Sequence, residues 1–519
     1  MLLSELISDF PYMDVQGDTC MKIEGIAYRS CNVHNGFLFF ALRGMKSDGH
    51  DYINDAYKRG AKAVIVEKFV EKLPGLTQIK VADSRDAMGR LSSVFYGNPS
   101  KKLRLVGITG TNGKTTTTYL IESILKEAGR EVGVIGTINC RFSGKTVDSA
   151  HTTPESLDLQ RLLRDMVDAG VEDCVMEVSS HALAQKRVAG TDIEGRIFTN
   201  LSQDHLDYHG DMDSYFLTKA AFFKEAEIPS GSKSVFSVVN VDDPKGDEII
   251  PENMKVLKYG RRNDADIKPL EILFSRVGIK GVIQVPGGEV KIASHLIGAF
   301  NLYNIMAAVG AGLGLGFSND VIERGISSLK GVSGRMERFH SEEGFDVIVD
   351  YAHTEDALKN VLLTLRGLMN DAENIGRLIT VFGCGGDRDK GKRPTMGKVS
   401  AEMSDITILT SDNPRSEDPQ RIIEDIEYGL KETGLQKING LSHVKKGYLI
   451  ELLRGDAIAR AIGMAQAGDT ILIAGKGHEN YQIVGDNVLS FDDCFEVKRA
   501  IEERQRVLED GIQAAFSQS

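Results

Sequence analysis

The segment best able to do chemistry is residues 110–116, which read Gly-Thr-Asn-Gly-Lys-Thr-Thr. An apolar run precedes it, and an apolar helical pattern resumes at Tyr119. A strand that turns through glycines into a helix points backbone N–H groups at a bound phosphate. A lysine at the helix start reaches the β- and γ-phosphates, and the next hydroxyl binds Mg²⁺. We therefore predict a nucleoside triphosphate site, with Lys114 on the phosphates and Thr115 on the metal.

This loop is shorter than the common pattern G-x-x-x-x-G-K-[ST], because Ile108 stands where the first glycine is expected. The alternative is a glycine-rich turn that binds no ligand. The order of glycine, lysine and threonine favours a phosphate clamp. Its predicted members are Gly110, Thr111, Asn112, Gly113, Lys114, Thr115 and Thr116.

Two further polar groups follow apolar strands. Glu177 ends the strand at 173–177, which is where a phosphate-loop fold keeps its second metal ligand. Residues 200–210 are dense in polar and ionisable side chains and include His205. A single histidine is usually a satisfied structural side chain, but this density favours a site.

The elements that position these groups alternate between strands and helices. The length of 519 residues favours roughly three domains. Breaks at 97–100 and 331–334 predict an N-terminal α/β domain at 1–98, a central domain at 99–330 and a C-terminal domain at 331–519. Alternation predicts mainly parallel sheets, with a third domain of dinucleotide-fold type that lacks the G-x-G-x-x-G fingerprint. The predicted strands are 104–109, 132–136, 173–177, 195–200, 234–240, 346–350, 378–382, 405–410 and 469–474.

Composition excludes several classes. With 41% hydrophobic and 26% charged residues the chain is typical of a soluble globular protein. A net charge of −12 gives no general attraction to nucleic acid or anionic membranes. Six cysteines without metal or disulfide spacing indicate reduced thiols in the cytoplasm. The N-terminus lacks a secretory pattern, and the uncharged run 296–317 contains five glycines, which favours a buried helix over a membrane span.

A set of motifs gives the chain a family resemblance that spans residues 28–482. In chain order they read GTNGKTT, HTTPE, MEVSSHAL, NLSQDHLDYHG, GAFNLYN, SGRMERF, VDYAHT, GCGGDRDKGKRP, SDNPR and AGKGHENYQ. The chain thereby resembles the Mur ligases of bacterial cell-wall synthesis, in particular the type that extends UDP-N-acetylmuramoyl-L-alanyl-D-glutamate. This family uses the short G-x-x-G-K-T clamp.

The resemblance implies an ATP-dependent ligase. ATP phosphorylates a carboxylate, and an amine attacks the resulting acyl phosphate. Cations must offset the repulsion between a carboxylate and a triphosphate. The resemblance implies two Mg²⁺ ions, one on Thr115 and Glu177 and the other on His205. It also matches Lys219 to a lysine that reacts with CO₂ to form a carbamate, although the residue type alone indicates an ordinary exposed helical lysine. The implied catalytic residues are Lys114, Glu177, His205 and Lys219.

The resemblance also implies substrate sites in all three domains. The positions matched to the UDP-muramoyl-dipeptide are Ser30, Met45, Lys46, Ser47, Thr152, Thr153, Ser179, Gln185 and Arg187. Those matched to adenine, ribose or phosphates are Asn301, Asn304, Arg335, Asp350 and His353. Two departures occur, since the family pattern Y-D-S-R reads Tyr28-Arg29-Ser30-Cys31 and a usual proline is Glu355.

A third set of positions matches the pocket for the incoming amino acid. An arginine in the motif Asp-Asn-Pro-Arg can pair with the second carboxylate of meso-diaminopimelate, which lysine lacks. The alternative is that Asn413 and Pro414 only open a turn. The matched positions are Arg388, Asp412, Asn413, Pro414, Arg415, Gly475 and Glu479.

We therefore predict a bacterial, cytoplasmic, monomeric ligase that adds meso-diaminopimelate to the D-glutamate γ-carboxylate. Its partners are small molecules rather than nucleic acid. The alternatives are the same ligation with L-lysine, a folylpolyglutamate synthase, which leaves HTTP and SDNPR unexplained, and a nucleotide-dependent switch that makes no amide.

Overall fold

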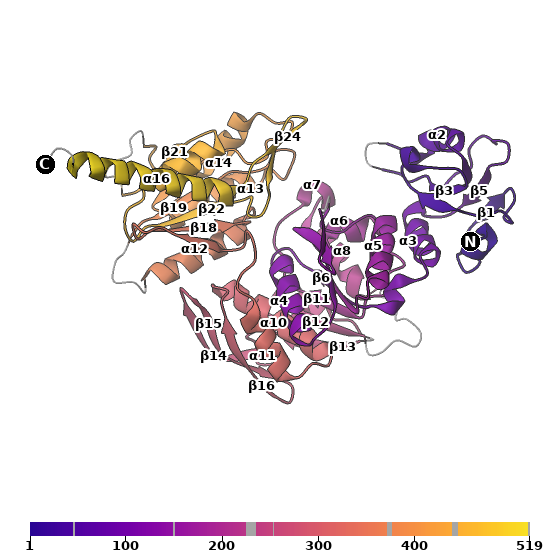
Figure 1. The fold of residues 1–519 in the computed structure, drawn as a ribbon, viewed down its shortest axis with the longest axis horizontal. Coiled ribbons are helices and arrows are strands. Elements are labelled where there is room, and N and C mark those ends of the chain that lie inside the picture. Colours follow the sequence, from indigo (N-terminus) through magenta and orange to yellow (C-terminus); the bar gives the residue numbers. More distant parts are fainter. Residues whose placement is uncertain are drawn as a thin grey trace.

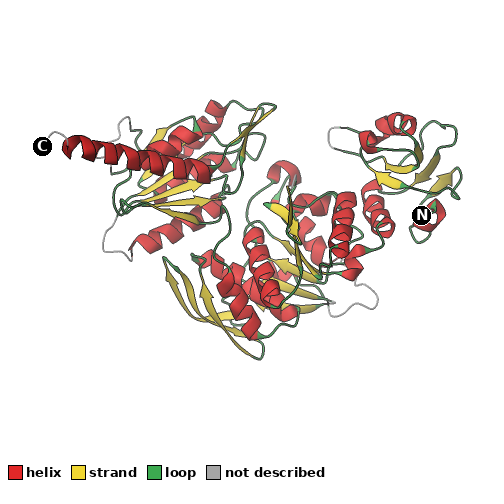
Figure 2. Ribbon diagram, viewed as in Figure 1, coloured by secondary structure: helices red, strands yellow, loops and turns green. Residues whose placement is uncertain are grey.

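The fold comprises three α/β units, with the central unit between the other two (Figure 1). It is seen in a computed structural model that describes residues 1–44, 47–148, 151–224, 235–252, 254–370, 376–438 and 445–516. Helices cover sheets in each unit (Figure 2). The predicted three-domain α/β fold class is confirmed.

The N-terminal unit is built on a five-stranded sheet of order β1-β5-β4-β3-β2, parallel except for β1. Val64, Ile65 and Val66 on the central strand β4 are fully buried. Burial on both faces suits such β-branched residues. The strands are β1 (Asp14–Gln16), β2 (Gly25–Ala27), β3 (Phe37–Phe40), β4 (Ala61–Val66) and β5 (Thr77–Lys80). The helices are α1 (Leu3–Leu6), α2 (Ile53–Lys58) and α3 (Ser84–Phe95), with 3₁₀ turns at Ser30–Asn32, Gly49–Tyr52 and Pro99–Lys102.

The central unit has an eight-stranded sheet of order β13-β12-β11-β6-β10-β7-β8-β9. The strands from β13 to β7 are parallel, and β8 and β9 extend the edge as an antiparallel hairpin. Parallel strands place their carboxyl ends at one edge, where ligands bind. The strands are β6 (Arg104–Thr109), β7 (Val132–Ile135), β8 (Asn139–Phe142), β9 (Lys145–Asp148), β10 (Asp173–Glu177), β11 (Gly195–Phe198), β12 (Phe236–Asn240) and β13 (Lys255–Tyr259).

Helices cover this sheet, and a small antiparallel sheet of order β14-β15-β16 packs beside α10 and α11 (Figure 1). The helices are α4 (Lys114–Glu127), α5 (Ser156–Asp168), α6 (Ser180–Ala184), α7 (Leu206–His209), α8 (Met212–Lys224), α9 (Gly246–Ile249), α10 (Ala299–Gly314) and α11 (Asn319–Ser328). The added strands are β14 (Lys268–Ser275), β15 (Gly278–Val285) and β16 (Gly288–Ser294).

The C-terminal unit has a six-stranded sheet of order β17-β18-β22-β19-β20-β21, parallel except for β17. A two-stranded hairpin, β23 with β24, follows β22. The strands are β17 (Glu337–His340), β18 (Asp346–Asp350), β19 (Leu378–Phe382), β20 (Ile406–Leu409), β21 (Gly447–Ile450), β22 (Thr470–Ala474), β23 (Tyr481–Val484) and β24 (Asn487–Ser490). The helices are α12 (Glu355–Asn370), α13 (Lys392–Met403), α14 (Pro419–Glu432), α15 (Arg454–Gly463) and α16 (Asp493–Phe516).

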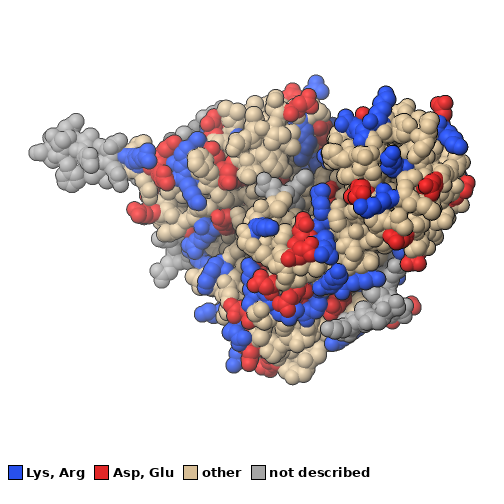
Figure 3. Space-filling model, turned by 45° about the vertical axis from the view of Figure 1, so that its right-hand side comes forward, with Lys and Arg blue, Asp and Glu red and all other residues tan. Residues whose placement is uncertain are grey.

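The uncharged run 296–317 forms the buried helix α10, whose residues from Ile305 to Val309 are all fully buried. Among the described residues, no helix combines the length and apolarity needed to cross a membrane. Basic and acidic side chains are interspersed over the face seen in Figure 3.

Candidate active site

The predicted phosphate clamp joins β6 to α4. Gly113 precedes α4 at its N-terminus with a left-handed φ of 87°, and the helix begins at Lys114. The Lys114 ammonium donates to the carbonyls of Gly110 at 2.8 Å and Thr111 at 2.9 Å. Burial lowers the pKa of Lys114. The lysine therefore occupies the loop interior, where a phosphate would replace carbonyl oxygens as its partner.

The two glycines of the clamp are required by close neighbours. A Cβ at Gly110 would lie 1.9 Å from Thr199 Oγ1, and one at Gly113 would lie 2.3 Å from Asn304 Oδ1. Thr199 Oγ1 donates to the Asn112 carbonyl at 2.6 Å, which fixes the loop against the end of β11. Side-chain contacts thus hold the clamp from two sides.

Glu177 and Thr115 meet as predicted for a shared metal ligand pair. Thr115 Oγ1 donates to Glu177 Oε2 at 3.0 Å, and Glu177 is 1% exposed. The N–H and hydroxyl of Thr137 each donate to the same carboxylate at 2.9 Å. Arg335, which comes from the C-terminal unit, donates to Thr115 Oγ1 at 3.3 Å. The clamp is therefore completed by a cation from another domain.

Lys219 lies on α8 and is 1% exposed, so the expectation from residue type of an exposed lysine is wrong. Its ammonium donates to the Gly110 carbonyl at 3.1 Å and lies 4.6 Å from the Tyr215 ring centroid. Burial, and then the charge of Lys114, lower its pKa well below the ordinary value. Two lysines share one carbonyl oxygen, so an uncharged or anionic form of Lys219 would relieve their repulsion.

His205 has a left-handed φ of 56° and directs its Nε2 to Asp204 Oδ2 at 3.3 Å. Burial lowers the pKa of His205 to about 3. A neutral imidazole is the form that binds metals. Asp204 is 6% exposed and also faces His353 Nε2 at 3.7 Å and Lys392 Nζ at 3.9 Å, both from the C-terminal unit. Asp204 therefore joins the two domains at the site.

The predicted adenosine residues lie on both sides of that junction. Asn304 and Asn301 are buried on α10 and bond to each other at 2.9 Å, behind the clamp. Asp350 at the end of β18 accepts N–H bonds from Met336 and Ala352, both at 2.8 Å. Burial raises its pKa. The contacts of Asp350 thus position the strand end beside Arg335.

The predicted dipeptide residues cluster at the ends of β10 and α6. Thr153 Oγ1 donates to the Glu177 carbonyl at 2.8 Å, and Thr152 Oγ1 lies 3.1 Å from Thr137 Oγ1. Ser179 caps α6. Arg187 is 8% exposed and donates to Gln185 Oε1 at 2.8 Å. This group is therefore continuous with Glu177, one of the two predicted metal ligands.

The residues of the N-terminal unit that are predicted to bind the nucleotide sugar are spread over separate loops. Ser30 begins the 3₁₀ turn after β2, and Ser47 is exposed. Met45 and Lys46 lie outside the described residues. Tyr28 OH donates to Asp158 at 2.7 Å, which ties this unit to α5 of the central unit.

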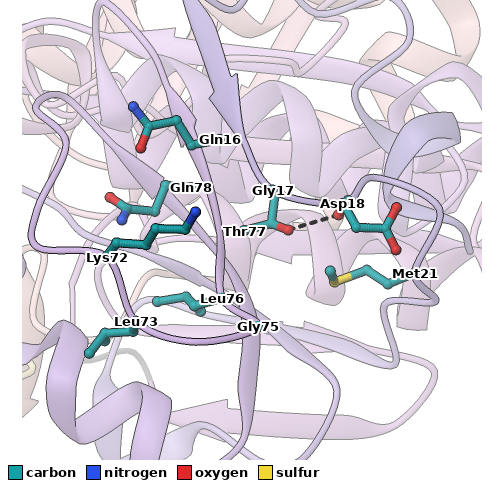
Figure 4. A pocket seen from close by; sticks show the side chains of 10 residues that line it. All are labelled: Gln16, Gly17, Asp18, Met21, Lys72, Leu73, Gly75, Leu76, Thr77 and Gln78. Atoms are coloured by element: carbon teal, nitrogen blue, oxygen red, sulfur yellow. Dashed lines mark hydrogen bonds between the residues drawn. The ribbon is translucent and has the colours of Figure 1, made fainter.

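Two cavities lie away from the predicted residues. One of about 110 Å³ is in the N-terminal unit, where Thr77 Oγ1 donates to the Asp18 carbonyl (Figure 4). Another of about 680 Å³ lies between the N-terminal and central units and is lined in part by Phe10, Arg90 and Phe222. None of the predicted site residues lines either cavity.

The residues predicted for the amino-acid pocket that follow β20 and β22 lie near one another at the ends of these strands. Asn413 Nδ2 donates to Glu479 Oε2 at 2.9 Å, and Asp412 is 7% exposed. Arg415 has φ of 51° and donates to the Gly386 carbonyl at 2.8 Å. Burial, and then the charge of Arg388, lower the pKa of Arg415. Pro414 and Gly475 are buried beside these side chains.

The amino-acid pocket and the clamp are neighbours. Tyr351 OH donates to Glu479 Oε1 at 3.4 Å, and the Arg335 guanidinium lies 4.3 Å from the Tyr351 ring centroid. Arg335 Nη1 lies 3.3 Å from His478 Nδ1. One side chain, Arg335, therefore contacts both the clamp threonine and the wall of the pocket.

The sequence prediction omitted four residues that the structure places in the site. Asp204 and Lys392 face each other across the domain junction, Thr137 binds Glu177, and Lys476 lies in the amino-acid pocket. Asp204, Lys392 and Lys476 fall inside motifs that carry the family resemblance, so these motifs could have indicated them as site residues. Thr137 lies outside those motifs.

A phosphate clamp, a carboxylate beside it and a cationic pocket across a domain junction define an ATP-using ligase of three domains. Three regions match family descriptions: residues 22–96 the Mur ligase family catalytic domain, 108–312 the Mur ligase middle domain, and 334–477 the Mur ligase glutamate ligase domain. The chain belongs to the Mur ligase family.

Full-length relatives carry one name. A UDP-N-acetylmuramoyl-L-alanyl-D-glutamate--2,6-diaminopimelate ligase from Geobacter sulfurreducens is 48% identical over 95% of this chain and 97% of its own length. The protein of the same name from Clostridium tetani is 42% identical over 97% of this chain and 100% of its own length.

Solved structures agree at the level of fold. A structure of a UDP-N-acetylmuramoyl-L-alanyl-D-glutamate--2,6-diaminopimelate ligase has a TM-score of 0.66 at 32% identity, covering 97% of this chain and 99% of that chain. MurF ligase from Thermotoga maritima in complex with ADP has a TM-score of 0.61 at 19% identity, covering 93% and 99%. Folylpolyglutamate synthase of Mycobacterium tuberculosis reaches 0.60 at 18% identity, covering 76% and 92%. The fold is therefore shared by ligases of different named substrates.

Proposed function

We propose that this protein is an ATP-dependent ligase that adds meso-diaminopimelate to the D-glutamate γ-carboxylate of UDP-MurNAc-L-Ala-D-Glu. It thereby acts in peptidoglycan precursor synthesis, in the bacterial cytoplasm. The observation that carries the proposal is the contact of Arg335 with both the clamp at Thr115 and the pocket wall at His478. That contact brings the phosphate donor and the amino acid to one junction.

The clamp binds ATP. Loop N–H groups and Lys114 hold the β- and γ-phosphates, and the carbonyls that now accept from Lys114 are released. Arg335 offsets charge on the γ-phosphate. Asp350, Asn301, Asn304 and His353 are assigned to the adenosine and the remaining phosphates.

Thr115 and Glu177 fit a hard cation, because a hydroxyl and a carboxylate supply the oxygen ligands that Mg²⁺ prefers. They would hold one Mg²⁺, and His205 another. Bound Mg²⁺ neutralises the triphosphate so that a carboxylate can approach. Lys219, buried with a lowered pKa, is assigned as the amine that takes up CO₂ and becomes an anionic carbamate.

The acceptor lies across the N-terminal and central domains. We propose that the N-terminal domain ends at residue 98 and the central domain at residue 330. Ser30 and residues 45–47 are assigned to the nucleotide, and Arg187 with Thr152, Thr153, Ser179 and Gln185 to the muramoyl-dipeptide. Arg187 currently pairs with Glu155 at 3.2 Å, so an anionic substrate exchanges one carboxylate partner for another.

The incoming amino acid enters the C-terminal pocket. Arg388 and Arg415 are two neighbouring cations whose repulsion a carboxylate relieves, and this favours diaminopimelate over lysine. Glu479, with Asp412 and Asn413, takes the distal ammonium. One end of the pocket is thus cationic and the other anionic.

The reaction follows from this placement. A γ-carboxylate oxygen of the acceptor attacks the γ-phosphorus, and ADP leaves. The amine nitrogen attacks the acyl carbon of the acyl phosphate, loses a proton, and the tetrahedral intermediate expels phosphate as the amide forms. Closing the site between domains excludes water, which would hydrolyse the acyl phosphate.

Phosphate release on the purified protein tests the proposal. We expect release only with ATP, UDP-MurNAc-L-Ala-D-Glu and meso-diaminopimelate together. Faster phosphate release with L-lysine than with meso-diaminopimelate would identify L-lysine as the amino acid that the enzyme adds. Release that ignores both the acceptor and the amino acid would indicate a nucleotide-dependent switch instead.

A further inference from the structure

Lys476 is a buried cation that the assigned substrate contacts leave without a role. It lies on the loop after β22 and is 0% exposed. Lysine is rarely buried unless it is paired, because desolvating an ammonium is costly. Its ammonium donates to the Tyr481 carbonyl at 2.7 Å and to Asn413 Oδ1 at 3.0 Å. These hydrogen bonds offset part of the cost of removing the Lys476 ammonium from water.

The same ammonium lies between the two carboxylates of the pocket. It is 3.3 Å from Asp412 Oδ1 and 3.4 Å from Glu479 Oε2. Arg454 is the other buried cation near Asp412, but it is paired with Asp493 through two bonds of 2.7 Å. Asp412 and Glu479 therefore contribute two negative charges and Lys476 one positive charge. The remaining single negative charge matches one ammonium group.

Lys476 and the backbone of Ile483 together fix the orientation of the Asn413 amide. A lysine ammonium has no acceptor, so it requires the amide oxygen on its side. The backbone N–H of Ile483 donates to the same oxygen at 3.0 Å. The amide NH₂ must then face Glu479 Oε2, which it reaches at 2.9 Å. Among the described residues, Glu479 Oε1 then accepts the long 3.4 Å bond from Tyr351 OH, which leaves this oxygen to receive a ligand.

We propose that Lys476 is a positioning residue for amino-acid selection, which sets both the net charge of the acidic end of the pocket and the free oxygen of Glu479. This inference rests on the proposed function, since it assumes that the pocket binds meso-diaminopimelate. Without Lys476 the acidic end carries two negative charges. The second charge repels the distal carboxylate of diaminopimelate but does not repel the side chain of lysine, which ends in an ammonium.

The test is Lys476→Met, assayed by phosphate release against meso-diaminopimelate and L-lysine. We expect the ratio of kcat/KM for the two amino acids to fall at least tenfold in favour of lysine, with the KM for ATP unchanged. Lys431→Met is the matched control, because Lys431 pairs with Glu427 at 2.7 Å on the surface of the same domain. An unchanged ratio in folded Lys476→Met would overturn the inference. Absence of diaminopimelate-dependent release in the wild type would instead overturn the proposed function.

A second variant keeps the inference testable if Lys476→Met does not fold. Asn413→Asp retains an oxygen for Lys476 and Ile483 but cannot donate to Glu479. We expect the same shift of the ratio toward lysine. Wild-type selectivity in this variant would show that the orientation of Asn413 does not select the amino acid.

Discussion

Lys219 shows how burial changes the charge state and chemistry of a side chain. The residue type predicts an ordinary exposed helical lysine, whereas in the structure its ammonium shares the Gly110 carbonyl with that of Lys114. Burial and that neighbouring charge both lower its pKa. A neutral amine is the form that reacts with CO₂, so the environment prepares the modification that we propose.

Lys219→Ala is expected to abolish amide formation, because the site loses the anion that carbamylation supplies. An added small carboxylate such as acetate should restore part of the activity by filling the space. Phosphate release measures both effects. Lys224→Ala, an exposed lysine on the same helix, is the control. Full activity of Lys219→Ala without acetate would reject the role.

Arg415→Ala is expected to weaken meso-diaminopimelate binding by about 2 to 4 kcal/mol, roughly 30- to 900-fold, if the guanidinium pairs with the distal carboxylate. Titration calorimetry with the amino acid, in the presence of the acceptor and a non-hydrolysable nucleotide, measures this loss. Arg421→Ala changes an exposed arginine of the same domain and should bind normally. Equal affinities of the two variants would contradict the assignment.

At the scale of elements, the clamp depends on glycines for two separate reasons. Gly113 adopts a left-handed φ and also faces Asn304 Oδ1. Gly129, just past the end of α4, has φ of 72° but no atom within 4 Å of an added Cβ. Comparing the two separates backbone strain from the close approach that the site requires.

Gly113→Ala is therefore expected to raise the KM for ATP more than tenfold, whereas Gly129→Ala should cost only about 1 kcal/mol of stability through backbone strain. Steady-state kinetics and thermal melting measure the two effects. If Gly129→Ala impaired ATP use as strongly as Gly113→Ala, strain alone would explain both.

At the scale of the whole molecule, the site exists only where two domains meet. Asp204 of the central unit faces His353 and Lys392 of the C-terminal unit. Gln203 donates to Asp389 at 3.2 Å and Asn112 to Asp356 at 3.1 Å across the same junction. The contacts described here are polar, as is common at interfaces between domains of one chain.

Asp204→Asn is expected to weaken this junction, because it removes the charge that faces a lysine and a histidine. We expect a larger radius of gyration in small-angle X-ray scattering and a higher KM for ATP. Asp207→Asn, the same change at an exposed position of α7, is the control. Unchanged scattering and kinetics in Asp204→Asn would show that the junction does not depend on this charge.

The amino-acid sequence was sufficient to predict the fold class, the clamp loop and the positions of the main parallel strands. The predicted strands at 104–109, 173–177, 346–350 and 378–382 agree with β6, β10, β18 and β19. Their signals are local, since an apolar β-branched run followed by glycine or a charge defines a buried parallel strand within a few residues. The sheet β14-β15-β16 went unpredicted because β15 and β16 alternate between buried and exposed positions, so no continuous apolar run marks them.

Which residues far apart in the sequence form ion pairs or hydrogen bonds with one another depended on the three-dimensional fold. Lys219 with Gly110, Asp204 with Lys392, and Lys476 with Asp412 are separated by 109, 188 and 64 positions. Residue type predicts an exposed lysine in each case, because the cost of burying an ammonium depends on partners that local sequence does not contain. The local sequence therefore predicts the clamp loop, whereas the fold brings the buried lysines close to the predicted site.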